Sequence, residues 1–234
     1  MMMKEKSVAQ LIYRIQLTSK EGTLGYYPGT RKLPESIEAY TMEDFRTVLT
    51  ESFKCEVEKR RVPLLDFSPE VVEKIEIISR CFTTEDCVRG LFLYGSIGPG
   101  KTILMKALYG VLRAAGCTDT DVVLTKATDL FDEYKMYHER LPSRYECMLK
   151  ARYLFLDDLG AEPVSCQIYG VNRLPIQDVI YERYDRQRMT IVSSNLDKPT
   201  LRDRYGTRMY DRMVEMMLPL YFSGPSYRCQ HGYE

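Results

Sequence analysis

The chain has 234 residues and a mass of 27.3 kDa, enough for one good hydrophobic core with an extension or for two small domains. Hydrophobic residues make up 44% and charged residues 28%, which excludes a disordered or fibrous protein. The 33 Lys and Arg balance the 33 Asp and Glu, so the whole surface does not attract nucleic acid, and any such contact must use a local patch.

Neither a membrane span nor a secretory leader is expected. No apolar run approaches the roughly 20 residues that a membrane-spanning helix needs, and the charged start, with Lys4, Glu5 and Lys6, is unlike a signal peptide. The 7 cysteines are scattered without a C-x-x-C pair, so reduced thiols are expected rather than a zinc site. We therefore predict a soluble, cytoplasmic protein without a membrane partner.

The N-terminal part, residues 1–65, is polar, rich in tyrosine and weakly patterned, and is predicted to form a small extension. One helix is expected to begin after Thr41, because threonine is a good N-cap and acids in the first turn suit the helix dipole. A second helix is expected from Ser68 and Pro69, since proline suits the first helical position.

Later in the chain, short apolar runs alternate with amphipathic stretches. Strands are expected near residues 91–94, 122–124, 153–156, 190–192 and 218–222, and helices near 101–115, 127–139, 174–187 and 200–216. This alternation is typical of a parallel sheet with crossover helices. The sequence therefore predicts an α/β domain over residues 66–234.

A glycine-rich segment between the first of these strands and its helix fits the phosphate-loop pattern G-x-x-x-x-G-K-[ST]. The predicted nucleotide-binding residues are Gly95, Ser96, Ile97, Gly98, Pro99, Gly100, Lys101, Thr102 and Ile103. The glycines let main-chain N–H groups turn toward phosphate oxygens, Lys101 reaches the β- and γ-phosphates, and the Thr102 hydroxyl is suited to bind Mg²⁺. The alternative is a glycine-rich turn that merely begins a helix.

Two carboxylates follow the apolar strand near residues 153–156. In phosphate-loop enzymes the first such acid holds Mg²⁺ and the next orients or deprotonates the attacking water. We assign Asp157 to Mg²⁺ and Asp158 to the water. The alternative is that both acids only form a turn after a buried strand.

Polar residues also follow the strand near residues 190–192. Asn195 stands where an amide beside the γ-phosphate positions water and senses phosphate loss, although an asparagine there is also a common turn residue. Arg208 and Arg212 are four residues apart and share one face of a predicted helix. Either one, presented to a neighbouring subunit, would act as an arginine finger; the alternative is an Arg–Asp helix surface.

Residues 183–213 also contain eight Arg and Lys against four Asp. This local excess of positive charge is suited to face nucleotide or DNA. A solvated helix surface is the alternative.

Together these motifs resemble the AAA+ ATPases of the DnaC/DnaI helicase-loader and IstB transposition-helper group, over about Gly90–Arg228. The segments that carry the resemblance are residues 90–102, 156–162 (Leu-Asp-Asp-Leu-Gly-Ala-Glu), 182–186, 193–196, 205–213 and 226–228. The phosphate loop is common to many families, whereas the order and spacing of the later segments is much more specific. The segment Pro163–Pro175 is longer than is usual in this group.

The resemblance implies a RecA-like sheet without a separate lid domain, ATP with Mg²⁺, and assembly into open rings or spirals with ATP between subunits. It implies action on single-stranded DNA and on a replicative helicase or a transposase, chosen by the extension at 1–65. Asp157 and Asp158 would form Walker B, Asn195 would be sensor 1, Arg212 or Arg208 the finger, and Arg228 a sensor-2-like arginine.

The leading hypothesis is thus an ATP-hydrolysing loader or remodeller of a replicative helicase. The alternative keeps the ATPase and makes it a transposition helper that acts with a transposase. A small-molecule kinase is a third reading, but the paired acids, Asn195 and the two arginines suit hydrolysis better. A GTPase is disfavoured because no N-K-x-D motif occurs. A degenerate nucleotide-binding interaction module also remains open.

Overall fold

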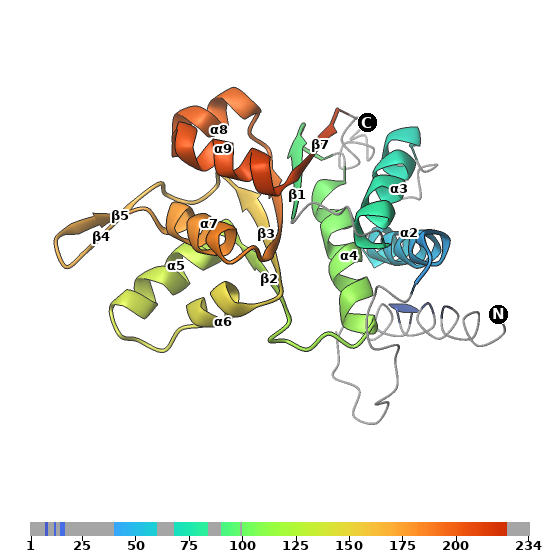
Figure 1. Cartoon of the computed structure of the whole chain (residues 1–234), viewed down its shortest axis with the longest axis horizontal. Coiled ribbons are helices and arrows are strands. Elements are labelled where there is room, and N and C mark those ends of the chain that lie inside the picture. Colours follow the sequence, from blue (N-terminus) through green and yellow to red (C-terminus); the bar gives the residue numbers. More distant parts are fainter. Residues whose placement is uncertain are drawn as a thin grey trace, which may run out of the picture. The chain divides into compact units, whose positions relative to one another are not determined.

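The computed structural model describes residues 40–59, 68–83, 90–98 and 100–223, together with four single positions between 8 and 16. These residues fall into two compact units. One comprises the described residues of 1–87 and 98–118, and the other those of 88–97 and 119–223 (Figure 1). Most of the predicted N-terminal extension lies outside the described residues, and its boundary after residue 65 stays a prediction.

The first unit contains helices α2 (Met42–Lys59), α3 (Pro69–Thr83) and α4 (Lys101–Ala114). Both expected helix starts are confirmed. The Thr41 hydroxyl accepts from the Asp44 N–H at 3.2 Å, and the Asp44 carboxylate accepts from the Thr41 N–H at 3.1 Å, which closes a reciprocal cap. Pro69 is the first residue of α3, and the Ser68 hydroxyl accepts from the third helical N–H at 3.3 Å.

The three helices of this unit pack through apolar faces. The rings of Phe45 on α2 and Phe82 on α3 stack with centroids 5.4 Å apart. Between α2 and α4 the backbones come close, because the Ser52 hydroxyl donates to the Ala107 carbonyl at 2.8 Å. These contacts fix α4, which begins immediately after the glycine-rich loop.

The second unit contains a five-stranded parallel sheet. Its strands are β1 (Gly90–Gly95), β2 (Val122–Lys126), β3 (Tyr153–Leu159), β6 (Met189–Ser194) and β7 (Leu218–Phe222), in the order β2-β3-β6-β1-β7. The strands are largely apolar runs, as expected for parallel strands that are covered on both faces. The predicted α/β class and all five predicted strands are confirmed.

The helices of the second unit depart from expectation in two places. They are α5 (Ala127–His138), α6 (Tyr145–Lys150), α7 (Pro175–Asp185), α8 (Lys198–Tyr205) and α9 (Thr207–Met216). The single helix expected near 200–216 is two helices, because Gly206 has φ of 83° and interrupts the helical path. The short α6 was not predicted. Helix α7 packs against both α5 and α9, so the three lie side by side (Figure 1).

A two-stranded antiparallel hairpin follows β3 in the unusually long segment 163–175. Strands β4 (Cys166–Ile168) and β5 (Val171–Arg173) are joined at Tyr169 and Gly170, both with positive φ, which is the geometry of a tight hairpin turn. The hairpin extends away from the neighbouring helices of its unit (Figure 1), and the Tyr169 side chain at its tip is 78% exposed. The extra length of this segment is visible in the sequence, but its two strands were not predicted.

Among the described residues no cysteine forms a disulfide. No group of His, Cys, Asp or Glu there is arranged to hold a metal ion by itself. None of the helices in the described ranges is long and apolar enough to cross a membrane.

Candidate functional site

The glycine-rich loop has the backbone that its sequence requires. Gly95, Gly98 and Gly100 have φ of 122°, 98° and 99°, a region that side chains with a Cβ rarely adopt. At Gly95 there is a second reason, because a Cβ would overlap the main-chain oxygen of Phe222 on β7. Ser96 donates its N–H to the same oxygen at 3.0 Å, so β7 anchors the start of the loop.

The loop leads directly into α4. Gly100 is the residue before the helix, and no side chain caps the helix start. The N–H groups of the first turn, and with them the positive end of the helix dipole, therefore lie at the loop. Lys101 is buried, Thr102 is half-buried and Ile103 is buried, whereas Ile97 is 65% exposed. Backbone N–H groups at a helix start, with a lysine and a threonine at its first positions, are suited to bind phosphate oxygens. Pro99 lies outside the described residues.

The two acids lie where β3 loses its regular pairing with β6. The register shifts between Leu156 and Leu159, and Asp158 has φ of 58°. Asp157 is only 5% exposed. Of the two neighbouring acids, Asp157 is buried and Asp158 is half-buried.

Ser193, on the neighbouring strand β6, holds both acids in place. Its hydroxyl donates to the Asp157 carboxylate at 2.5 Å and accepts from the Asp158 N–H at 3.0 Å. Ser194 next to it donates to the Leu159 carbonyl at 2.6 Å. No role was predicted for Ser193. The signal that could have identified it is a small polar residue near the end of a predicted strand, directly after the apolar residues Ile191 and Val192.

The predicted residues of the second unit share one edge of the sheet. Tyr94 of β1 is in register with Ser194 of β6, and β6 is the neighbour of β3. The start of the phosphate loop, the two acids and Asn195 therefore lie at or near the carboxyl ends of three adjacent strands, where open α/β sheets bind ligands. The Asn195 side chain is exposed at this edge.

The two predicted finger arginines lie on one face of α9 but in different surroundings. Arg212 Cζ lies 4.3 Å from the ring centroid of Tyr181 and 4.9 Å from that of Tyr184, and its guanidinium is 3.9 Å from the Asp185 carboxylate. Arg208 Cζ lies 5.5 Å from the Tyr181 ring and its side chain is exposed. Cation–π contacts thus hold Arg212 against α7, while Arg208 projects further toward solvent.

Arg183 does not belong to the basic surface expected over residues 183–213. Its side chain is 0% exposed and donates to the carbonyl groups of Met148, Leu149, Ala151 and Met189 and to the Thr190 hydroxyl. Burial, with a smaller effect of Arg188, lowers the pKa of Arg183 to about 9, so the group stays charged at neutral pH. It ties α7 to the sheet, and the expected patch loses one of its eight cations.

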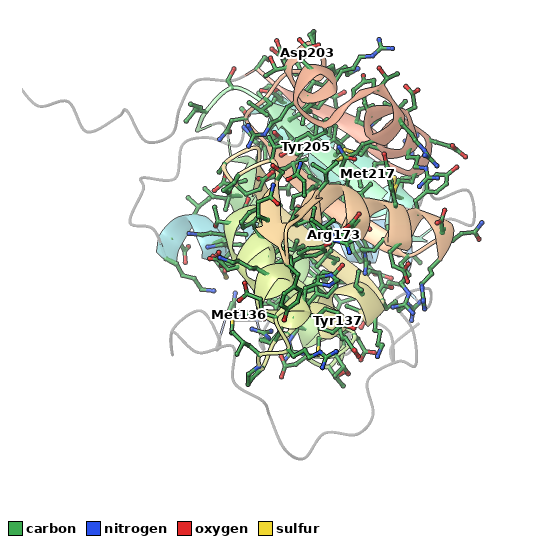
Figure 2. The ribbon with its side chains drawn as sticks, turned by 90° about the vertical axis from the view of Figure 1, so that its left-hand side faces the viewer. Met136, Tyr137, Arg173, Asp203, Tyr205 and Met217 are labelled. Carbon is green, nitrogen blue, oxygen red and sulfur yellow. The ribbon has the colours of Figure 1, made fainter. Side chains whose placement is uncertain are left out.

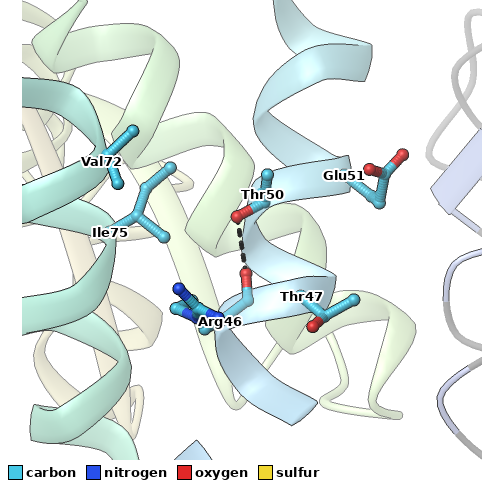
Figure 3. A pocket seen from close by; sticks show the side chains of 6 residues that line it. All are labelled: Arg46, Thr47, Thr50, Glu51, Val72 and Ile75. Carbon is cyan, nitrogen blue, oxygen red and sulfur yellow. Dashed lines mark hydrogen bonds between the residues drawn. The ribbon is translucent and has the colours of Figure 1, made fainter. Parts of the chain in front are cut away.

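A surface pocket of about 310 Å³ lies elsewhere, between α2 and α3 (Figure 3). Its lining residues are Arg46, Thr47, Thr50, Glu51, Val72 and Ile75, and none of them was predicted to bind nucleotide. Its polar groups are engaged within α2, since the Thr50 hydroxyl donates to the Arg46 carbonyl at 2.8 Å and Arg46 pairs with Glu43. We assign this pocket no part in the candidate site. Arg228 lies outside the described residues.

This combination of a parallel sheet, a glycine-rich loop that opens a helix, and acids near the end of a strand separated by one strand from the one before the loop is that of the P-loop class of nucleotide-binding proteins. A family model described as IstB-like ATP binding protein matches residues 66–234, and the chain belongs to this AAA+ ATP-binding family. The resemblance stated from the sequence is thereby confirmed. No match is found among curated proteins.

Solved structures share the fold. A structure of DnaI matches with a TM-score of 0.55 and 22% identity over 78% of this chain and 93% of that one. A DnaC helicase loader matches with a TM-score of 0.50 and 19% identity, over 67% and 92% of the two chains. AMPPCP-bound DnaA from Aquifex aeolicus matches with a TM-score of 0.52 and 16% identity, over 84% of this chain but 53% of DnaA. At these identities the likeness shows the RecA-like fold alone.

Proposed function

We propose that this protein hydrolyses ATP with Mg²⁺ and uses the reaction to load or remodel a replicative DNA helicase on single-stranded DNA. The observation that carries the ATPase proposal is the clamp of Ser193 on the two acids at the sheet edge where the phosphate loop begins. Ser193 thereby fixes the Asp157 carboxylate and the main chain of Asp158, and in this proposal Asp157 faces the metal and Asp158 the water. The family match to ATP-binding proteins supports the same nucleotide.

In this proposal Lys101 binds the β- and γ-phosphates, while Thr102 and Asp157 hold Mg²⁺, whose charge offsets that of the phosphates. Asp158 orients the attacking water. A shorter acid than glutamate has to reach that water, and the left-handed backbone at Asp158 turns its side chain away from the regular strand direction. Asn195 senses the γ-phosphate.

Assembly completes the proposed site. An arginine of α9, Arg208 or Arg212, enters the active site of a neighbouring subunit in a ring or spiral and stabilises charge in the transition state. Arg228 contacts the nucleotide as a sensor-2-like residue.

Subunit mixing tests the arginine assignment. Arg208→Ala and Arg212→Ala are each measured alone and mixed with a Lys101→Ala subunit, which retains its arginines. The true finger variant binds ATP, has no turnover alone and regains some in the mixture, since the second subunit supplies the missing cation. Arg186→Ala is the matched control, because Arg186 is exposed and, among the residues that the structure describes, forms its ion pair with Glu182 of the preceding helical turn. If no mixture regains turnover, an arginine acting between subunits is refuted.

A second function, a transposition helper acting with a transposase, is favoured by the description of the matching family as IstB-like. The two differ in partner and share the ATPase. A tagged Asp158→Asn protein, which should bind ATP and hydrolyse it slowly, is used with ATP to capture partners from its own cell extract. Recovery of the replicative helicase supports the loader, and recovery of a transposase supports the helper. If single-stranded DNA alone is recovered, both partner proposals are refuted and a DNA-dependent ATPase remains.

A further inference from the structure

A third carboxylate, outside the assigned site, is buried close behind the two acids. Glu162 is 1% exposed, and its carboxylate forms no ion pair among the described residues. One carboxylate oxygen accepts from the Gly160 N–H at 2.9 Å, and the other accepts from the Tyr205 hydroxyl. Burying a charge is costly unless donors compensate for lost water, so these two contacts determine where this carboxylate lies.

On one side Glu162 holds the turn that follows the acids. Asp158 and Gly160 have φ of 58° and 105°, and the Ala161 N–H donates to the Asp158 carbonyl at 3.1 Å. Glycine adopts a positive φ without strain, but Asp158 has a Cβ, and its left-handed backbone needs support from its surroundings. The bond from the Gly160 N–H supplies it, two residues after the acid assigned to the attacking water.

On the other side Glu162 holds the junction of α8 and α9. Tyr205, the last residue of α8, is 3% exposed and lies toward the interior, whereas Asp203 of the same helix lies at the outer side (Figure 2). Burial and the bond to Glu162 both raise the pKa of Tyr205, so its hydroxyl remains a donor. Arg204 adds a bond from its guanidinium to the Glu162 carbonyl. The next residue, Gly206, is the N-cap of α9, the helix that carries Arg208 and Arg212.

We propose that Glu162 is a positioning residue that links the turn after Asp158 to the α8–α9 junction. Through this link the water-orienting acid and the finger arginines of the same subunit keep fixed positions relative to each other. This inference rests on the proposed ATPase function. Its physical basis is that one rigid, buried group bridges a donor from the turn and a donor from the junction. Loss of either contact lets the two segments move independently.

The test uses Tyr205→Phe, which removes only the hydroxyl from the bridge. Tyr134→Phe is the matched control, because Tyr134 is 1% exposed and also donates its hydroxyl to a carboxylate of the same unit, that of the half-buried Asp178. Turnover, the Kd of a fluorescent ATP analogue and the melting temperature are measured for wild type, both variants and Lys101→Ala. We expect Tyr205→Phe to lower kcat at least tenfold with the Kd changed less than threefold, and Tyr134→Phe to leave kcat within threefold.

Mixtures of two different variant subunits test separately the two contacts that Glu162 makes, one to the turn after Asp158 and one to the α8–α9 junction. One subunit carries Arg208→Ala with Arg212→Ala and keeps its ATP site, while the other carries Lys101→Ala and supplies the arginines. Tyr205→Phe placed in either subunit should lower the turnover of the mixture, because both the acid and the arginines depend on the bridge. A merely destabilising change would instead lower the melting temperature and leave the mixture active.

Glu162→Gln is the second variant, in case Tyr205→Phe does not fold. Glutamine can accept from the Gly160 N–H and donate to the Tyr205 oxygen, so positioning is kept and kcat should stay within about threefold of wild type. A hundredfold loss in folded Glu162→Gln would show that the charge itself acts, and would overturn the proposal. So would a Tyr205→Phe kcat equal to that of Tyr134→Phe. If wild type shows no turnover that depends on Lys101, the ATPase proposal itself fails.

Discussion

Replacing Ser193 by alanine should reveal how strongly the sheet holds the two acids. The variant removes a hydroxyl that donates to the Asp157 carboxylate at 2.5 Å and accepts from the Asp158 N–H at 3.0 Å. A hydrogen bond to a charged group contributes about 1.5–3 kcal/mol, and a buried N–H left without an acceptor costs about 1–3 kcal/mol. Because Asp158 is half-buried, water offsets part of the second loss, and we expect a net loss of about 2–4 kcal/mol.

Urea unfolding at pH 7 measures this loss as a change in the free energy of unfolding at constant m-value. A loss of that size is a large share of the free energy of unfolding of a typical domain, which is roughly 5–15 kcal/mol. Ser165→Ala is the matched control, because Ser165 is exposed and lies in the loop after the acids. Its free energy of unfolding should change by less than about 0.5 kcal/mol, as is usual for surface substitutions. An equally small change in Ser193→Ala would refute the clamp.

Three further outcomes are expected. Gly95→Ala should destabilise the protein far more than Gly170→Ala. Both glycines have a positive φ, but only at Gly95 would the added Cβ overlap backbone atoms. Equal midpoints of the two variants in chemical denaturation would contradict this expectation. Burial raises the pKa of Tyr134 and of Tyr205, so as the pH rises these tyrosines lose their protons in the unfolded chain before they do so in the folded one. The free energy of unfolding should therefore fall above about pH 10, by about 1.4 kcal/mol per pH unit for each tyrosine. Tyr134→Phe should show a shallower fall, and an unchanged slope would refute this explanation. Arg183→Met removes the donor from several carbonyl groups and should lower the free energy of unfolding by at least about 3 kcal/mol, measured by thermal unfolding. An unchanged melting temperature would show that these hydrogen bonds do not stabilise the fold.

Much of the fold follows from local patterns in the sequence. The strands were predictable because each is a short apolar run bounded by polar residues, and a parallel sheet buries both of its faces. The phosphate loop was predictable because its backbone needs positive φ at several positions, and the sequence has glycines there, at 95, 98 and 100.

Contacts between distant segments were not predictable in the same way. The role of Ser193 depends on the register of β6 against the bulge in β3, and no single segment shows that register. Glu162 likewise meets Tyr205 only after folding, 43 positions along the chain. A helix near 200–216 was expected as one piece because Gly206 alone is a weak signal for a break.

Arg183 shows the limit of counting charges. It was grouped with the exposed cations of its region, although its spacing from Ile176, Val179 and Ile180 places it on the buried face of α7. The helical period, applied to charged residues as well as apolar ones, would have marked it as an interior residue. Its hydrogen-bond partners, however, are carbonyl groups of other segments and could not have been named from the sequence.

The most direct test of the central claim is the rate of Mg²⁺-dependent ATP hydrolysis by the purified chain, with and without single-stranded DNA. Lys101→Ala is compared with Lys106→Ala, a half-buried lysine further along the same helix. We expect turnover by wild type and by Lys106→Ala. In Lys101→Ala both turnover and ATP binding should be lost, because the phosphates lose their cation. Equal turnover by the two lysine variants would refute the proposed ATP site.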